Sequence, residues 1–452
     1  MRRHSLIFRL GGGDRSRMEW VEPSSTRTQV DLVDSNGKLA HGIGDTLDGL
    51  AKLGITPSVI GVDLLLISSA VYAADKRINR TTEAQDSWTR EIDLHIPVAQ
   101  PEIWARVASA LQEMLQFLTG DRWRLFFRLS PKKYRSLAAE AVSPPAMLTS
   151  CCLFSGGLDS FIGAIDLLHQ GESPLLVSHG WVASDSKHQQ LCRDALIASF
   201  SSASIRHLRS RVGFPEHLVR DSEAERTERS RSFLFFSLAA LAVSGTSSPT
   251  RIYIPENALI SLNIPLDPLR LGAFSTRTTH PFYLARFNEM LTSVGISSQL
   301  DNPYRHMTKG EMVSNCKDKA LLERSHTLTM SCSSASKARW KGLPPSHCGH
   351  CVPCIIRKAA LAKMSIPDAT VYVTDIHARP LNSMKAEGGD IRSFQFAIHR
   401  LRNDPNRARV LIHQSGPLAD YQTDIEEFAQ VYLRGLQEVE RLLTGVSASP
   451  NV

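Results

Sequence analysis

The stretch CCLFSGGLDSFIGAIDLL, residues 151–168, places two adjacent glycines between two apolar runs. The first run predicts a buried strand, and the apolar positions three and four apart in the second predict a helix. Gly156 and Gly157 therefore lie in a short turn from strand to helix. Glycine allows positive φ and lacks the Cβ that would keep a ligand away from main-chain amides. Because a helix N-terminus adds unpaired N–H donors and partial positive charge, the turn predicts a phosphate site.

The turn follows neither the G-x-x-x-x-G-K-[ST] nor the G-x-G-x-x-G pattern, and it contains no lysine. An ordinary tight turn, with Asp159 or Ser160 as the helix cap, is the alternative. The serine hydroxyls on both sides of the glycines favour the phosphate site, because they can donate to the same oxygens. The predicted phosphate-binding residues are Ser155, Gly156, Gly157, Leu158, Asp159 and Ser160.

Short apolar runs such as LTSCCLF, PLLVSH and RIYIP alternate with helical stretches from residue 148 onward. This alternation favours an α/β fold, in which helices cover both faces of a parallel sheet. The paired prolines Pro144 and Pro145 predict the boundary with the preceding segment. We therefore expect an N-terminal α+β domain over residues 1–145, an α/β domain over 146–385 and a C-terminal helical extension over 386–452.

Four of the eight cysteines lie within or just before the run SHCGHCVPC. Thiolates at this spacing can converge on one ion, and four of them close a tetrahedral Zn²⁺ site with a structural role. The alternatives are an iron–sulfur cluster, a site in which His347 or His350 replaces one thiolate, and unligated cysteines. The predicted zinc ligands are Cys332, Cys348, Cys351 and Cys354.

Charge and hydropathy limit the classes of partner. The 452 residues include 52 Lys and Arg against 45 Asp and Glu, a net charge of +7 that favours an anionic partner. The longest apolar stretch, residues 58–74, is interrupted by Asp63 and is shorter than the roughly 20 residues of a membrane span. We expect a cytoplasmic protein without a membrane partner.

The six residues SGGLDS, from Ser155 to Ser160, resemble the PP-loop of the ATP pyrophosphatases. This resemblance implies a HUP-type sheet, the adenine nucleotide α-hydrolase-like fold, and a loop that cradles the pyrophosphate of ATP. In combination with CGHCVPCIIRKAA, the loop resembles the QueC family of 7-cyano-7-deazaguanine synthases over about residues 148–365. The segments around Arg231 and Lys309 resemble two further QueC segments, and the family implies ATP, Mg²⁺ and structural Zn²⁺ as cofactors.

Two features depart from ordinary QueC proteins: the first 145 residues, and the long segment IPENALISLNIPLDPLRLGAFSTRTTHP after the RIYIP strand. Both resemble the QueC-like proteins of bacterial anti-phage operons, above all the QatC proteins of the Qat system. That resemblance implies a ligase that adenylates the carboxylate of 7-carboxy-7-deazaguanine, or a similar deazapurine, and passes it to an amine. It also implies protein partners from the same operon, one of which can supply the amine.

Polar residues concentrate in this long segment, just past a predicted strand, where open α/β sheets bind ligands. A carboxylate such as Glu256 can accept hydrogen bonds from a guanine-like edge, whereas an arginine suits an anionic group. A solvated surface loop is the alternative. The predicted substrate-binding residues are Glu256, Asn257, Asn263, Arg270, Ser275, Arg277, Thr278 and His280.

Four residues are predicted to act in catalysis: Ser155, Asp159, Ser160 and Lys309. His179 and Arg231 are predicted to bind the nucleotide, although His179 can equally be a structural histidine. Two other functions compete with the ligase. One is a tRNA-modifying adenylating enzyme, for which the diffuse positive charge makes nucleic acid the less favoured partner. The other is an ATP-sensing subunit that binds ATP without cleaving it.

Overall fold

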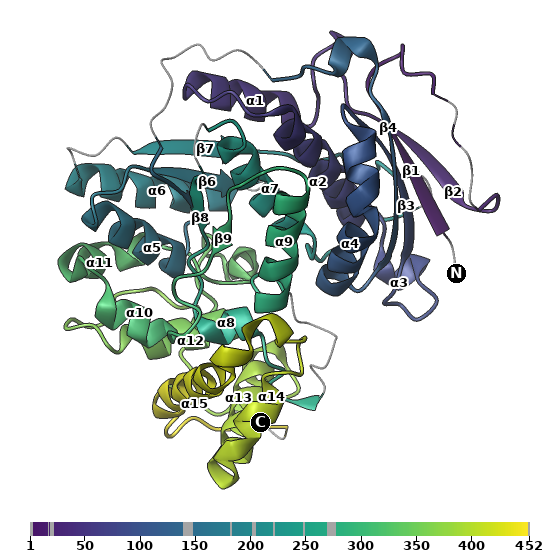
Figure 1. Ribbon diagram of the computed structural model, residues 1–452. Coiled ribbons are helices and arrows are strands. Elements are labelled where there is room, and N and C mark those ends of the chain that lie inside the picture. Colours follow the sequence, from purple (N-terminus) through teal and green to yellow (C-terminus); the bar gives the residue numbers. More distant parts are fainter. Residues whose placement is uncertain are drawn as a thin grey trace.

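The computed structural model of the protein describes residues 3–16, 18, 22–138, 148–180, 183–200, 205–219, 222–246, 249–268 and 277–450. A parallel five-stranded sheet lies at its centre, with the order β7-β6-β5-β8-β9 (Figure 1). Its strands are β5 (Ser150–Leu153), β6 (Pro174–His179), β7 (Arg206–Ser210), β8 (Arg251–Tyr253) and β9 (Leu300–Asp301). The predicted boundary at Pro144 and Pro145 lies outside the described residues.

Helices cover both faces of this sheet, as the sequence predicts. Cys151 of β5 joins one buried apolar cluster together with α7 (Arg231–Val243). Cys152, the next residue along the strand, joins another cluster together with α5 (Leu158–His169). Successive side chains of a strand point to opposite faces, so the two helices lie on opposite sides of the sheet. The central helices are α5, α6 (Ala183–Ser199), α7, α8 (Ala258–Leu262), α9 (Pro281–Ser293), α10 (Lys309–Asn315), α11 (Lys319–Ser325) and α12 (Val352–Leu361).

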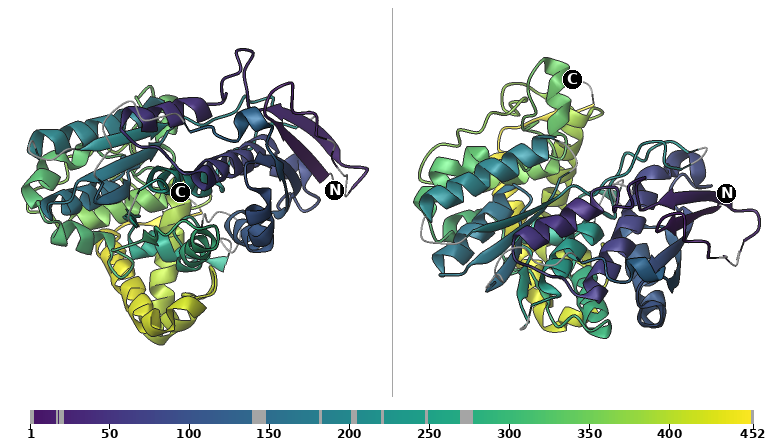
Figure 2. Two further views of the ribbon diagram at one scale, coloured as in Figure 1. Left: turned by 45° about the horizontal axis from the view of Figure 1, so that its top comes forward. Right: turned by 90° about the horizontal axis from the view of Figure 1, so that it is seen from above.

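A second sheet, with the order β2-β1-β3-β4, lies at the N-terminal side of the molecule (Figures 1 and 2). All of its strand pairs are parallel, which corrects the expected α+β arrangement of residues 1–145 to an α/β one. The physical reason is the connection between β3 and β4, because parallel neighbours need a crossover and α4 supplies it. The elements are β1 (Arg3–Arg9), β2 (Thr26–Asp31), α1 (Ile43–Lys52), α2 (Val59–Arg77), α3 (Arg80–Glu83), β3 (Glu91–Val98), α4 (Pro101–Thr119) and β4 (Arg122–Leu129).

The two sheets share one apolar core. Buried side chains form a continuous cluster from Leu6 of β1 to Leu300 of β9. The helix α2, which contains the longest apolar stretch of the sequence, packs against α7 of the central layer. Its buried Asp63 accepts hydrogen bonds from the amides of Ala99 and Gln100, 2.7 and 3.0 Å away. The N-terminal sheet is thus anchored to the layer that carries the glycine turn.

The C-terminal helices form a third layer beside α8 and α12, with their own buried cluster. They are α13 (Ala386–Asn403), α14 (Ala408–Leu411) and α15 (Ile425–Leu442), next to the strand pair β10 (Leu381–Asn382) and β11 (Ala448–Ser449). Among the described residues, no helix has both the length and the apolar character of a membrane span. Short 3₁₀ helices cover Lys132–Tyr134, His326–Leu328, Ala335–Lys341, Pro405–Arg407 and Ala419–Asp424.

We predict that Gly61→Ala destabilises the fold. A Cβ on Gly61 would overlap the Ser244 hydroxyl and lie 2.9 Å from Ser244 Cβ and 3.4 Å from Leu241 Cα, so α2 would have to move away from α7. Overpacking of this kind costs roughly 1–3 kcal/mol, which exceeds the gain of about 1 kcal/mol in helix propensity. The midpoint of thermal unfolding should therefore fall by a few degrees.

Gly389→Ala in α13 is the matched control, because the nearest atom to its added Cβ is Ser383 O at 3.7 Å. This variant should unfold at the same temperature as the wild type or slightly above it. Equal midpoints for the two variants would contradict a close approach of α2 to α7.

Candidate active site

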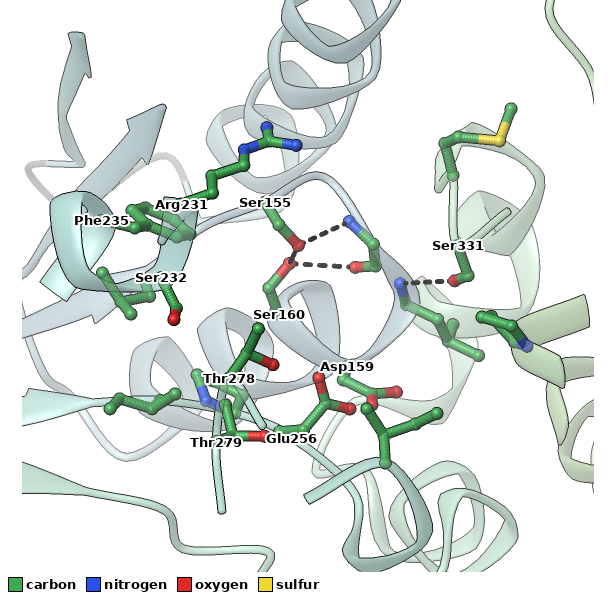
Figure 3. A pocket seen from close by; sticks show the side chains of 18 of the residues that line it. Ser155, Asp159, Ser160, Arg231, Ser232, Phe235, Glu256, Thr278, Thr279 and Ser331 are labelled. Carbon is green, nitrogen blue, oxygen red and sulfur yellow. Dashed lines mark hydrogen bonds between the residues drawn. The ribbon is translucent and has the colours of Figure 1, made fainter. Parts of the chain in front are cut away.

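A cavity of about 500 Å³ opens at the carboxyl ends of β5, β6 and β8 (Figure 3). Parallel strands bring the residues that follow them to the same edge of the sheet, so segments far apart in the sequence meet here. The glycine turn, the start of α7 and the start of α10 line the cavity, together with residues 330–332. Figure 3 shows the Ser155, Ser160, Asp159 and Glu256 side chains directed toward the same space.

The glycine turn has the conformation that the sequence predicts. Gly156 has φ +79°, and a Cβ there would lie 2.9 Å from Gln189 N on α6. Both the backbone conformation and the close approach of α6 therefore require glycine. Gly157 is extended, with φ −84° and ψ 167°, and forms the N-cap of α5. The first amides of α5 consequently face the cavity.

Hydroxyl groups accept hydrogen bonds from the first amides of this turn. Gly157 N donates to Ser155 Oγ over 3.2 Å, and Leu158 N donates to Ser331 Oγ over 3.3 Å. The Ser155 and Ser160 hydroxyl oxygens lie 3.1 Å apart, and Ser160 Oγ donates to Gly157 O. A phosphate oxygen can accept from the same amides, and each hydroxyl can donate to it.

A pair of carboxyl groups and a lysine lie beside the turn. Lys309 Nζ is 2.9 Å from Asp159 Oδ1, and Asn257 Nδ2 donates to Asp159 Oδ2 over 2.8 Å. Burial opposes the ionisation of Asp159, but Lys309 and the hydrogen bonds more than offset it and lower its pKa. Burial and the neighbouring Asp159 carboxylate raise the pKa of Glu256 well above its ordinary value. The pKa values of the two neighbouring carboxyl groups are therefore shifted in opposite directions.

Lys309 is buried and is held in position by the C-terminal layer. It is the first residue of α10, whose N-cap Thr308 forms a capping box with Glu311. Glu438 of α15 accepts hydrogen bonds from Thr308 Oγ1 at 2.7 Å and from Gly310 N at 3.1 Å. Arg434 of α15 donates to Glu311 over 2.6 Å. The ammonium group thus depends on a helix more than 100 residues later in the sequence.

His179 and Arg231 both line the cavity. His179 ends β6, and its Nε2 donates to Val212 O over 2.9 Å. Burial, and secondarily the nearby Arg231, lower the pKa of His179 to about 4, so the ring is neutral at neutral pH. Arg231 donates to His179 O over 3.1 Å. The Nε2 atom of this histidine is therefore paired, whereas its buried Nδ1 has no hydrogen-bond partner within the described residues, and its role in nucleotide binding stays a prediction.

The predicted substrate residues separate into two groups. Glu256 and Thr278 line the cavity, and Asn257 supports Asp159 from below the surface. Two others lie away from it: Arg277 stacks on Phe117 of α4, 4.6 Å from the ring centroid, and His280 caps α9. Asn263, the αL cap at the end of α8, is also absent from the lining. Arg270 and Ser275 lie outside the described residues.

The cavity also contains residues that the sequence does not single out. They include His188, Glu228, Ser232, Phe235, Phe236, Thr279, Met330 and Ser331. Phe235, near the start of α7, offers aromatic surface that suits a planar ligand, whereas the Phe236 ring is buried and packs on Tyr283 and Phe287. Ser331 approaches α5 from a distant segment, and the only local signal for it is its position directly before a predicted zinc ligand.

The four predicted zinc ligands come together. Their sulfur atoms all lie within 4.8 Å of one another, from Cys332, Cys348, Cys351 and Cys354. Two Sγ–Sγ pairs are 3.9 Å apart, close to the separation of about 3.8 Å that four Zn–S bonds of about 2.3 Å require. Cys348 N and Cys351 N donate to neighbouring sulfurs over 3.3 Å, which stabilises thiolates. The cluster can therefore hold a tetrahedral metal ion such as zinc.

The histidines beside this cluster have other roles or positions. His347 Nε2 accepts a hydrogen bond from Ser331 N over 3.2 Å. Neither His347 nor His350 belongs to the group of converging ligands among the described residues. Four sulfurs leave no open coordination position, so a metal ion bound here would stabilise the fold and would not bind substrate.

Comparison with known proteins gives one partial relative. The chain is 30% identical over 155 residues to a 7-cyano-7-deazaguanine synthase from Syntrophobacter fumaroxidans. The alignment covers 32% of this chain, and the chain spans only 56% of the length of that enzyme. No family model matches. The similarity supports a distant relationship to QueC-type enzymes.

We predict that Cys351→Ser removes the bound metal. Loss of one of four thiolates leaves the site incomplete, so the metal content of the purified protein, measured by mass spectrometry, should fall from about one zinc per chain to well below half. Cys192→Ala is the matched control, because Cys192 lies on α6, is buried in the core and is not part of the cluster. This control should keep its metal, and equal metal contents in both variants would contradict the four-cysteine site.

Proposed function

We propose that the protein is a QueC-like ATP-dependent ligase. It adenylates the carboxylate of 7-carboxy-7-deazaguanine, or of a similar deazapurine, with release of pyrophosphate, and an amine then displaces AMP from the acyl-adenylate to form an amide. The observation that carries this proposal is the glycine turn at the N-terminus of α5, with Asp159 and Lys309 beside it in a cavity of about 500 Å³. The partial similarity to a 7-cyano-7-deazaguanine synthase supports the same class of reaction.

The turn would bind the two phosphates that ATP loses. The amides of Gly157 and Leu158 would donate to pyrophosphate oxygens in place of the serine hydroxyls. Ser155 and Ser160 would then rotate to donate as well, because a hydroxyl can act as donor or acceptor. These fixed dipoles would stabilise the negative charge that develops as the substrate carboxylate attacks the α-phosphorus and pyrophosphate departs.

Asp159 and Lys309 would act on the same charge. The ionised Asp159 is an oxygen ligand of the kind that Mg²⁺ prefers, and bound Mg²⁺ would neutralise phosphate charge. Lys309 is a buried cation 2.9 Å from that carboxylate and would attract the phosphates directly. Because positioning and charge stabilisation supply most of the rate in such reactions, both groups are catalytic residues in this proposal.

The substrate base would occupy the part of the cavity between α7 and the end of β8. Phe235 offers an aromatic face, and Thr278 and Glu256 offer polar groups for the edge of a deazapurine. Glu256 would accept hydrogen bonds from the guanine-like N–H groups through its carboxyl oxygens. A planar bicyclic base needs this combination of apolar face and polar edge.

The acceptor and the biological role follow from the resemblance to QatC proteins. The N-terminal layer and the long segment between β8 and α9 carry this part of the proposal. An amine on a protein from the same operon would receive the deazapurine, and the modified protein would act in anti-phage defence. Mass spectrometry of a candidate partner protein, before and after incubation with the ligase, tests it.

We predict that Asp159→Asn abolishes AMP formation. Purified protein is incubated with ATP, Mg²⁺ and 7-carboxy-7-deazaguanine, and AMP and pyrophosphate are followed over time. Loss of this carboxylate removes the ligand for Mg²⁺ and the partner of Lys309, so the rate should fall at least about a hundredfold. Asp194→Asn, an exposed position on α6, should keep the wild-type rate.

Each alternative function has its own outcome in this assay. ATP binding without any pyrophosphate release would identify a sensor and contradict the ligase. AMP formation that requires tRNA and ignores the deazapurine would identify a tRNA-modifying enzyme. Wild-type AMP formation by Asp159→Asn would contradict the assignment of the site.

A further inference from the structure

One short segment connects the cysteine cluster to the glycine turn. Met330 N donates to Gly156 O over 2.8 Å, and Ser331 Oγ accepts from Leu158 N over 3.3 Å. Met330, Ser331 and Cys332 all line the cavity. This segment therefore contacts Gly156 and Leu158, the residues on either side of Gly157 in the predicted pyrophosphate site. In Figure 3 the Ser331 hydroxyl approaches the first turn of α5 from the side opposite to Ser155.

The same segment is fixed on its other side by the cysteine cluster. Ser331 N donates to His347 Nε2 over 3.2 Å, next to Cys348. Cys332 Sγ accepts from Cys348 N over 3.3 Å and lies 3.9 Å from Cys351 Sγ. A metal ion bonded to Cys332 would therefore hold Ser331 in place through a single peptide unit.

We propose that Ser331 is a phosphate-binding residue and that metal binding at the cysteine cluster is energetically coupled to nucleotide binding at the glycine turn. This inference rests on the proposed function, because it concerns the same phosphate site. It adds a ligand from outside the S-G-G-L-D-S turn, and it assigns the metal a second effect beyond stability of the fold.

The coupling follows from what each group can do. In the free protein Ser331 accepts from Leu158 N, and its own hydroxyl hydrogen remains available. When a phosphate oxygen accepts from Leu158 N, Ser331 can donate to that oxygen from where it already lies. Without the metal, Cys332 would no longer be bonded through the ion to the other three cysteines. Only hydrogen bonds would then attach the segment that carries Ser331 to the cluster. The phosphates would then have to order this segment on binding, at a cost in affinity.

Nucleotide binding provides the first test. The probe is α,β-methylene-ATP with Mg²⁺, which cannot release pyrophosphate, and its Kd is measured by calorimetry. Ser331→Ala should weaken binding by roughly ten- to 150-fold, the effect of one hydrogen bond to a charged group. Ser331→Thr keeps the hydroxyl and should retain most of the affinity. Ser333→Ala, an exposed serine two residues away, should bind as the wild type does.

Metal affinity provides the second test, because coupling between two sites is reciprocal. The zinc affinity of the purified protein is measured by competition with a chelator of known affinity, with and without α,β-methylene-ATP. The nucleotide should tighten zinc binding by the same factor by which zinc tightens nucleotide binding. Asp159→Asn, in which nucleotide binding should be weakened, is the control. If the nucleotide acts only by chelating zinc in solution, this variant will show the same change in zinc affinity as the wild type.

The outcomes separate this inference from the proposed function. If α,β-methylene-ATP does not bind the wild type, both are overturned. If it binds the wild type and Ser331→Ala equally well, or if it leaves the zinc affinity unchanged, the inference is overturned while the ligase proposal stands. A wild-type protein that holds no metal at the cysteines would also overturn the coupling.

Discussion

The first amides of α5 impose the constraint on which the site depends. An amide at a helix N-terminus has no partner within its own helix, and in a buried setting it must find an acceptor elsewhere. Here one acceptor is local, the hydroxyl of Ser155 two residues before Gly157, and the other is the hydroxyl of Ser331 from a distant segment after α11. A hydroxyl is a weaker partner for such an amide than an anion is, and an anion such as the proposed phosphate could therefore replace it.

The parallel sheet explains why unrelated segments meet at these amides. The strands β5, β6 and β8 end at one edge, so the glycine turn, His179 and Glu256 follow them into the same cavity. The N-terminal layer supports this edge from the side, since α2 packs against α7 and α7 begins at the cavity. The charge pattern is then local: Lys309 ion-pairs with Asp159, whose pKa is lowered, and the neighbouring Asp159 carboxylate and burial raise the pKa of Glu256.

The sequence allowed prediction where a local pattern determines a local structure. Gly156 was predictable because its positive φ and its contact with α6 both exclude a side chain. Three of the four cysteines were predictable from the close spacing Cys-x2-Cys-x2-Cys, and the resemblance to QueC proteins indicated Cys332 as the fourth. Ser331 was not, because its contact with Leu158 joins residues far apart in the chain. Arg277 looked like a ligand residue from its neighbours in the sequence, yet it stacks on Phe117 of a layer whose parallel topology no local pattern revealed.

The C-terminal layer stabilises the position of one residue of the site, although none of its described residues lines the cavity. Glu438 is buried against the start of α10, and burial raises its pKa. Its side chain accepts from Thr308 and Gly310, so it fixes the first turn of the helix that carries Lys309. Gly310 is a glycine for the same reason, because a Cβ there would overlap the Glu438 carboxyl group. The position of the lysine that faces Asp159 is therefore set by α15, which means that a truncated chain ending before α13 would lose the ion pair along with the third layer.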